Sequence, residues 1–574
     1  MGATVFSGSS LAVSVGHDRF QPSASDGGES AEVAEMHDLN SFEENAEANP
    51  VTNDQVLFSR CRFEPFAGQT DTYATLASNE HDAIVNDSAF EFADGTTCYE
   101  PQNESNIVIN PHNDQNVVTS SNDYRSNFGA CWAYVSDNGG TTWVNIQMPG
   151  WTAATGAKGQ FVKTGCGGDP VMAFAPDGTL YFAAITYNLD KFPRTMSGVA
   201  VASSKDGGHT WTPPVMVSYN AAGNFFLDKE WMAVGNDGTV YLTWTTFYSG
   251  PRGLGYLKSP IVMATSRNGG KSWSSAKEVS DAAHPYNQGS QVGMTPDGTL
   301  YVAYSSASPS SHYNTDVLAV SRSTDGGNSF TTSEPGRIYD DLDCYPLQIG
   351  AQGRQTLTNE QFRVGALPSM AIDPTNGTIA IVWADNKDVG NCGGTYETSY
   401  DGTTTSSQVR LAVSTDGITW TNSDVTSKNT SPADKVYPSV GANAGVISVG
   451  YYTRGYSPTP TDTDRLCGIM ERDNTSGDLV LPTDTARKNA AVCLDWAIKV
   501  STNGGSSFGT EVRVTSQSSN PYILFSGSFI GDYTGTAVDS QGNTVTAWTD
   551  FRGKPGVTSP NQDIMVGTYP SPIH

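Results

Sequence analysis

The octapeptide SDNGGTTW, residues 136–143, decides the fold because the chain repeats it. The further copies are SKDGGHTW at 204–211, SRNGGKSW at 266–273, STDGGNSF at 323–330, STDGITW at 414–420 and STNGGSSF at 501–508. In each copy the Asp or Asn side chain can accept hydrogen bonds from backbone N–H groups of the turn, and glycine allows a positive φ. The final aromatic residue is predicted to pack between neighbouring sheets.

A second repeat runs out of phase with the first and consists of an apolar strand, a turn that usually contains glycine, and another strand. It is clearest in DPVMAFAPDGTLYFAAITY from residue 169 and EWMAVGNDGTVYLTWTTF from residue 230, and related segments start at residues 106, 290, 368, 437 and 531. Asp-Gly or Asn-Gly between alternating apolar residues is a strong hairpin signal. The two repeats together predict an all-β propeller of four-stranded antiparallel blades. Seven blades fit the hairpins, and six blades with an accessory module are the alternative.

The last unit lacks the repeated turn, since DIMVGTYP from residue 563 is followed by only a few residues. An uncovered strand edge pairs readily with other chains, so we expect an N-terminal strand to close the ring. The apolar segment QVLFSRCRF, residues 55–63, is the predicted strand. Residues 1–50 are acidic and polar and are expected to form a flexible arm, residues 51–574 the propeller, and residues 456–493 a long insertion.

Composition restricts the function. The formal charge is −27, from 59 acidic and 32 basic residues, which disfavours nucleic acid and anionic lipid as partners. Nothing in the sequence predicts a transmembrane span. The eight cysteines are dispersed, which favours an oxidising compartment and therefore secretion or the cell surface, although free buried thiols are the alternative. Among the 105 connectivities that eight cysteines allow, pairing in chain order is the simplest: Cys61–Cys98, Cys131–Cys166, Cys344–Cys392 and Cys467–Cys493.

The repeated octapeptide resembles the Asp-box, or BNR, repeat of the sialidase-like β-propeller superfamily. The resemblance implies a structural hairpin at the outer rim, remote from the active site. True sialidases carry a Phe/Tyr-Arg-Ile-Pro stretch, three arginines that clamp the sialate carboxylate, an Asp acid/base and a Tyr-Glu nucleophile pair. This sequence has no Arg-Ile-Pro, and KFPRTM from residue 191 has the order reversed. No residue role is therefore transferred by motif.

Propeller topology narrows the search for a site. The first strand of each blade lines the central channel, and ligands should meet residues that lead into that strand or leave the second one. The predicted catalytic residues at this face are Asp228, Glu230, Asp532, Tyr533 and Tyr437. The predicted substrate-binding residues are Asp169, Lys229, Arg363, Lys435, Arg454 and Arg552, with the three arginines as a possible carboxylate clamp. Glu104, Asp434, Asp550, His312 and Tyr313 belong to the same face.

Carboxylates beside Arg and Tyr are suited to binding or cleaving an acidic sugar. The hypothesis is therefore a secreted exo-glycosidase or lyase that acts on acidic glycans. The alternative is a non-catalytic glycan-binding, adhesin or self-assembling surface protein that associates through its N-terminal arm. At the residue level, Asp169 is alternatively a turn residue, Asp228, Lys229 and Glu230 a solvated ion-pair cluster, and the arginines partners of neighbouring acids. No cofactor or metal is predicted, and Ca²⁺ has no motif to support it.

Overall fold

The computed structural model describes residues 70–571 apart from 75–81, 85–88, 92–96, 100, 124–129, 154, 188–196, 222–223, 250–255, 341–344, 349–353, 388–404, 457–466, 468–470, 473–478, 481–491, 523–528 and 553–561. Within these residues the helical elements are α3 (Phe161–Thr164) and the 3-10 turn η2 (Pro309–Ser311). The all-β prediction is confirmed.

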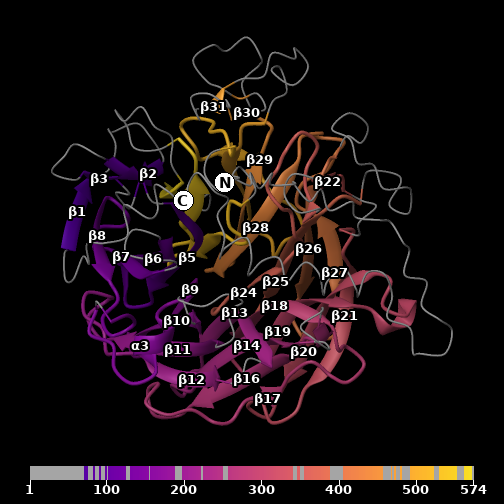
Figure 1. Cartoon of the computed structure of the whole chain (residues 1–574). Helices are drawn as coiled ribbons and strands as arrows, with labels where there is room; N and C mark the ends of the chain where they lie inside the picture. The colour runs from indigo at the N-terminus through magenta and orange to yellow at the C-terminus, as the bar shows by residue number, and fades with distance from the viewer. Residues whose placement is uncertain are drawn as a thin grey trace, which may run out of the picture.

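Seven antiparallel sheets surround one axis and are called blades 1 to 7 in chain order (Figure 1). Blade 1 contains β5 (Gln102–Asn110), β6 (Asn113–Asp123), β7 (Ala130–Ser136) and β8 (Thr142–Gln147), with β1 (Thr70–Ala74) outside β8. Blade 2 contains β9 (Gly168–Phe174), β10 (Leu180–Tyr187), β11 (Ser197–Ser204) and β12 (Val215–Asn220). Blade 3 contains β13 (Phe225–Val234), β14 (Val240–Ser249), β16 (Ile261–Ser266) and β17 (Lys277–Glu278), and β15 (Tyr256–Lys258) pairs with β14.

The remaining blades repeat this order. Blade 4 contains β18 (Asn287–Met294), β19 (Leu300–Ala307), β20 (Asp316–Ser323) and β21 (Thr331–Arg337). Blade 5 contains β24 (Ser369–Ile372), β25 (Ile379–Asp385), β26 (Gln408–Ser414) and β27 (Thr421–Asp424), and blade 6 contains β28 (Lys435–Asn443), β29 (Val446–Thr453), β32 (Asp495–Ser501) and β33 (Val512–Arg513). Blade 7 contains β34 (Gly535–Val538), β35 (Thr544–Asp550), β36 (Asp563–Tyr569) and β2 (Asp82–Ile84). Three two-stranded sheets lie apart: β3 (Ala89–Glu91) with β4 (Thr97–Tyr99), β22 (Leu347–Gln348) with β23 (Arg354–Gln355), and β30 (Glu471–Arg472) with β31 (Leu479–Val480).

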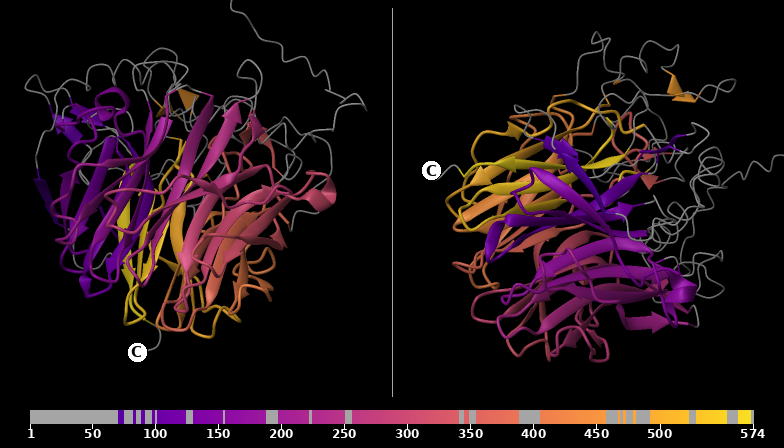
Figure 2. Two further views of the ribbon diagram at one scale, coloured as in Figure 1. Left: turned by 90° about the horizontal axis from the view of Figure 1, so that it is seen from below. Right: turned by 90° about the vertical axis from the view of Figure 1, so that its left-hand side faces the viewer.

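The innermost strands form the wall of the central channel. They contact one another in the ring order β5, β9, β13, β18, β24, β28, β34 and back to β5. Figure 2 shows the same blades from the side, packed face to face around the axis. The first strand of each blade therefore lines the channel, as the sequence predicts.

An N-terminal strand closes the ring. In blade 7, β2 pairs with β36 in antiparallel register, Asp82 opposite Gly567 and Ile84 opposite Met565. The predicted closure is confirmed, but its assignment to residues 55–63 is wrong, because Asp82–Ile84 occupies the outer position. Residues 55–63 and the predicted arm, residues 1–50, lie outside the described residues.

The repeated turn has the hydrogen bonds that its sequence predicts. In blade 1, Gly140 N donates to Ser136 Oγ (2.9 Å) and Thr142 N donates to Asn138 Oδ1 (2.8 Å). Trp143 is fully buried, and its Nε1 donates to Gly140 O (3.0 Å). Gly139 N donates to Gln115 O (2.9 Å) in β6. The turn therefore lies beside the β5–β6 hairpin connection and at the end of the blade opposite the start of β5.

Two of the predicted disulfides are present, Cys131–Cys166 and Cys467–Cys493. The second one joins Cys493, at the end of the predicted insertion 456–493, to Cys467 within it, and most of this insertion lies outside the described residues. The other two predicted pairs, Cys61–Cys98 and Cys344–Cys392, involve residues that the structure does not describe and stay predictions.

Candidate functional site

Several innermost strands share one irregularity at the end where they begin. The pairing register skips two residues in β5, β13, β18 and β28, as in a β-bulge. The first residue of each skipped pair has a positive φ: Glu104 59°, Lys229 51°, Gly289 69° and Tyr437 48°; Asp169, at the start of β9, has 55°. Such a conformation costs a non-glycine residue about 1–3 kcal/mol and is concentrated at functional sites.

The Lys229 ammonium group lies at the centre of a ring of buried charged side chains, which Lys229 forms with Glu104, Asp169 and Asp532. Its Nζ lies 3.3 Å from Glu104 Oε1, 3.0 Å from Asp169 Oδ2 and 2.8 Å from Asp532 Oδ2. Burial disfavours the charged form of Lys229, but Asp169, Asp532, Glu104 and Asp228 outweigh it and raise its pKa well above the usual value. All of these side chains are at most 6% exposed, so the alternative of a solvated ion-pair cluster is wrong.

Asp532 binds a second cation, the guanidinium group of Arg363, which lies outside the ring. Arg363 donates through Nε to Asp532 Oδ1 (2.8 Å) and through Nη2 to Asp532 Oδ2. Burial opposes ionisation of Asp532, but Arg363 and Lys229 hold its pKa below the usual range. Arg363 belongs to the connection between blades 4 and 5, so that connection reaches across to blade 7.

Asn122, at the end of β6, fixes the two neighbouring acids. Its Nδ2 donates to Glu104 Oε2 (2.6 Å), and its Oδ1 accepts from Asp169 N (2.6 Å). Glu104 Oε1 also accepts from Asp532 N (3.1 Å), which links blade 1 to blade 7. Asp169 is therefore more than a local turn residue.

Glu230 and Tyr533 lie next to this network but outside its hydrogen bonds. Both line a small cavity of about 30 Å³ that is also bordered by Lys229, Tyr437 and Asp532. Glu230 is 2% exposed, and neither of its carboxyl oxygens has a hydrogen-bond partner; the Tyr533 hydroxyl also has none. A cavity of this size holds about one water molecule and no sugar ring.

The protonation states of these two groups follow from their surroundings. Burial raises the pKa of Glu230 well above its usual value, and the charges of Asp169 and Asp228 raise it further. Burial and the neighbouring carboxylates also raise the pKa of Tyr533. The cavity therefore combines a carboxyl group whose pKa is raised, Glu230, with one whose pKa is lowered, Asp532.

The other predicted residues have partners of their own. Tyr437 lines the cavity, and its hydroxyl donates to the Arg363 carbonyl. Lys435 Nζ donates to Ser431 Oγ (2.6 Å), Ser431 O (3.2 Å) and Ala433 O (2.9 Å). Arg552 binds Asp550 in its own blade, Nε to Oδ1 at 2.8 Å. Since Arg363, Arg454 and Arg552 bind three different carboxylates, their contacts do not form a shared clamp.

A second buried acid, which the sequence analysis did not select, lies near Arg454. Glu360 is 1% exposed, and its carboxyl oxygens have no hydrogen bond, although Arg454 Nη1 lies 3.7 Å from Oε1. Arg454 instead binds Asp434 through Nη2 and donates from Nη1 to Thr358 O (2.6 Å). Burial raises the pKa of Glu360 well above its usual value. Glu360 is not among the residues that line the small cavity.

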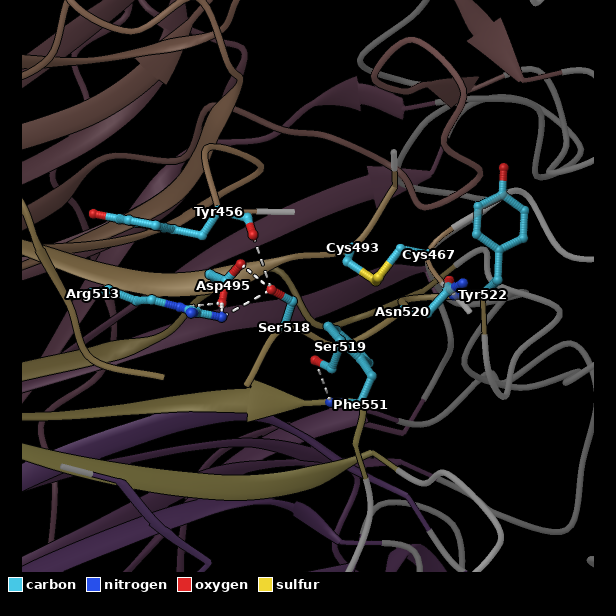
Figure 3. Close-up of a disulfide and its surroundings, with 10 residues drawn as sticks. All are labelled: Tyr456, Cys467, Cys493, Asp495, Arg513, Ser518, Ser519, Asn520, Tyr522 and Phe551. Atoms are coloured by element: carbon cyan, nitrogen blue, oxygen red, sulfur yellow. Dashed lines mark hydrogen bonds and ion pairs between the residues drawn. A yellow bond between two sulfur atoms is a disulfide. The ribbon is translucent and has the colours of Figure 1, made fainter. Parts of the chain in front are cut away.

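The Cys467–Cys493 disulfide lies next to the start of β32 in blade 6 (Figure 3). To one side of it in Figure 3, Arg513 donates to Asp495 Oδ1 (2.9 and 2.7 Å), and Ser518 Oγ donates to Asp495 Oδ2 (2.8 Å). Tyr522 lies to the other side, and its hydroxyl donates to Asn359 O (2.6 Å). This contact holds the segment that carries Glu360 and Arg363 against the connection between blades 6 and 7.

A larger cavity of about 560 Å³ follows the innermost strands from the ring toward their other ends. Its wall includes Ile109, Met172, Met370, Val440 and Val538, and its far end reaches the hairpin turns at residues 110–114, 374, 443 and 539–540. The two cavities share Trp231, Ser369 and Thr534 as lining residues. The ring of buried charges thus lies at one end of the channel.

The described residues contain no group of three or more His, Cys, Asp and Glu side chains that could hold a metal ion. The expectation of no cofactor remains an expectation. No helix in the described part of the chain is long and apolar enough to cross a membrane.

The structure brings together a large part of the predicted site. Asp169, Asp228, Lys229, Glu230, Asp532 and Tyr533 meet at one end of the channel with Arg363 and Tyr437, whereas Lys435, Arg454 and Arg552 have contacts elsewhere. Asn122 and Glu360 were missed. Asn122 could have been selected because it ends a second strand; no signal marked Glu360.

Comparison of the whole structure with solved structures finds other proteins at low similarity. A protein of unknown function from Dyadobacter fermentans is 14% identical, with a TM-score of 0.38 over 65% of this chain and 95% of that one. The GH93 α-L-arabinofuranosidase of Fusarium graminearum, in complex with arabinobiose, is 14% identical, with a TM-score of 0.39 over 66% and 92%. The intramolecular trans-sialidase of Ruminococcus gnavus is 12% identical, with a TM-score of 0.37 over 70% and 94%. At these values the likenesses carry no argument about activity. No protein-family model matches the sequence, and no curated protein does.

Proposed function

We propose that this chain is an extracellular glycan-active propeller that hydrolyses a glycosidic bond at the ring around Lys229. The single observation that supports the proposal is the position of Glu230 and Asp532 on one cavity, where burial favours the protonated form of Glu230 and Arg363 and Lys229 favour the ionised form of Asp532. Glycoside hydrolysis needs both forms, because one carboxylic acid protonates the leaving oxygen and one carboxylate stabilises or attacks the sugar cation. Glu230 is the proposed acid, Asp532 the proposed carboxylate and Tyr533 a proposed substrate-positioning group.

The charge of the glycan is a separate question. An acidic sugar was hypothesised from the basic residues of this face, but Lys229, Arg363 and Arg454 each bind carboxylates of the chain itself. These contacts favour no particular charge. The disulfides are consistent with the proposed extracellular location.

The test compares two buried glutamates that differ in position. Glu230→Gln keeps the shape of the protonated acid and removes its proton, so we expect hydrolysis of aryl glycosides and oligosaccharides to fall by about 10²–10⁴-fold. Glu360→Gln is the matched control, since Glu360 is equally buried but does not line the cavity. Equal activity of the wild type and Glu230→Gln would rule out the assigned role of Glu230.

A specific observation favours a second candidate, a non-catalytic glycan-binding or adhesive surface protein. The small cavity does not hold a sugar, and Glu104, Asp169 and Asp532 all bind the Lys229 ammonium group. A broad glycan panel that shows binding without turnover would support this candidate. Its proposed self-association through residues 1–50 is tested by size measurement before and after removal of residues 1–60, where a monomer throughout would exclude it.

A further inference from the structure

The channel of about 560 Å³ has a size typical of ligand pockets, which range from about 300 to 1,000 Å³. Its residues come from the innermost strands of blades 1, 2, 3, 5, 6 and 7. The strands make a rigid wall, and the hairpin turns between the first and second strands surround the opening. This opening lies at the end opposite the ring of buried charges.

The two ends of the channel differ in access. At the ring end, Lys229, Asp532 and Arg363 are 5%, 6% and 5% exposed. At the turn end, Pro374 and Ser540 are exposed and Val108 and Ile109 are half-buried. Glu230 and Tyr533 line the small cavity whose residues Trp231, Ser369 and Thr534 also line the channel. The channel and the small cavity that Glu230 lines therefore adjoin at these three residues.

The lining of the channel defines the chemistry of an occupant. Asp114 and Asp539, at the turn end, are the charged side chains among its described lining residues. Asp114 Oδ2 accepts from Ser540 Oγ (2.5 Å), and Asp539 Oδ1 accepts from Gln541 N (2.9 Å) and Asn543 N (2.8 Å). Within the described part of the chain neither acid forms an ion pair with a basic side chain, so the opening repels anions.

The inner end of the channel offers an aromatic surface. Trp231 is half-buried and contacts Tyr533 edge to face, with ring centroids 6.3 Å apart. Serine and threonine hydroxyls accompany it, for example Ser439 Oγ and Thr536 Oγ1, which are 2.7 Å apart. A wall of mixed polar and apolar surface, with an aromatic ring and hydroxyl groups, fits a molecule with both apolar and hydroxyl faces.

We propose that the turn end of the channel is the binding site for the uncharged end of a glycan, which stacks on Trp231 and reaches Glu230 from that side. The approach of the glycan to Glu230 rests on the proposed function, whereas the binding of an uncharged glycan in the channel does not. It changes the expected substrate from an acidic to an uncharged sugar.

The route is tested by thiol labelling. Ser369→Cys places a thiol on a residue shared by the two cavities. We expect methanethiosulfonate reagents to modify it, the anionic reagent slowest, and the double change Pro374→Trp/Ser540→Trp at the opening to slow labelling at least about fivefold. Asp177→Trp/Asn236→Trp is the matched control, on exposed hairpin turns that do not line the channel. If the Pro374→Trp/Ser540→Trp change does not slow the labelling of Ser369→Cys, the proposed route is wrong.

The occupant is tested by calorimetry with arabinobiose, cellobiose and lactose as uncharged probes and digalacturonate and sialyllactose as anionic ones. We expect an uncharged probe to bind, and Trp231→Ala to weaken it about tenfold, or 1.4 kcal/mol. Binding of the anionic probes alone, or of none of the uncharged ones, refutes the assignment. Failure of the two proposals is distinguishable. Hydrolysis that needs Glu230 but is unaffected by Pro374→Trp/Ser540→Trp contradicts only the route, whereas binding without any hydrolysis contradicts only the catalytic proposal.

Discussion

Replacement of Lys229 by methionine should destabilise the fold strongly and in a pH-dependent way. The change removes the cation that lies 3.3, 3.0 and 2.8 Å from Glu104, Asp169 and Asp532. Asp532 keeps Arg363, and Glu104 keeps Asn122 and a backbone N–H. Asp169 is affected most, because Lys229 is the partner of its Oδ2 and its Oδ1 has none. Removing one partner of a buried pair costs about 3–5 kcal/mol.

The pH dependence has a definite sign. Without Lys229 the pKa of the buried carboxylates rises, so the folded variant binds protons that the unfolded chain releases above about pH 4. The stability deficit is therefore greatest at pH 8 and smaller at pH 5. Adding Asp169→Asn to Lys229→Met removes an uncompensated charge and should recover part of the loss at pH 8.

The assay is guanidinium unfolding followed by tryptophan fluorescence at pH 5 and pH 8. Lys258→Met is the matched control, because Lys258 pairs with Glu278 at 2.9 Å but the two side chains are 44% and 56% exposed. Such a surface pair contributes at most about 1 kcal/mol. If Lys229→Met costs no more than Lys258→Met at pH 8, the ring is not held together by its central cation.

Three further predictions concern stability. Burial raises the folded pKa of Glu230, so wild-type stability falls as pH rises above about 4.3, the pKa in the unfolded chain. Glu230→Gln should flatten this decline between pH 5 and 8, whereas the exposed control Glu278→Gln should leave it unchanged. Burial lowers the pKa of Lys435 to about 8, so its contribution makes stability rise between pH 8 and about 10.4, and a Lys435→Met variant that shows the same rise would contradict this origin. Replacing Cys467 and Cys493 by serine opens a loop of 26 residues and should cost about 3 kcal/mol in thermal unfolding, whereas an unchanged midpoint would mean that the disulfide does not constrain the unfolded chain.

The fold was predictable because local signals repeat. The repeated octapeptide fixes a turn whose hydrogen bonds are entirely local, such as Gly140 N to Ser136 Oγ, and the hairpin glycines mark the connections. Asp228, Lys229 and Glu230 could be placed at the channel because they directly precede an apolar strand in that repeat. Closure by Asp82–Ile84 was not predictable, since a strand of three residues carries almost no pattern and its pairing with β36 spans nearly the whole chain.

Two features of the site could not be predicted from the sequence: the bulges in the innermost strands and the path of the connection between blades 4 and 5. Positive φ at Glu104, Asp169, Lys229 and Tyr437 has no sequence signal, because none of these residues is glycine; only Gly289 carries one. Arg363 and Glu360 belong to a connection whose path depends on contacts with other blades, such as Tyr522 with Asn359. The burial of the site was not predicted either. Residues that were expected at an open mouth of the channel are enclosed, and their charged groups bind one another.

A ring of buried charges has two physical explanations, a rigid plug or a site. A plug would favour complete pairing, since an unsatisfied buried polar group costs about 1–3 kcal/mol and apolar residues of similar size would avoid that cost. Lys229 and Asp532 fit a plug, because each has several partners of opposite charge. Glu230 and Tyr533 do not, because their polar atoms face a cavity without hydrogen-bond partners. A fold that needed only rigidity at this point would gain stability from Gln or Leu in place of Glu230 and from Phe in place of Tyr533. We therefore infer a site rather than a plug, because a bound ligand would supply the missing hydrogen bonds beside the strained backbone.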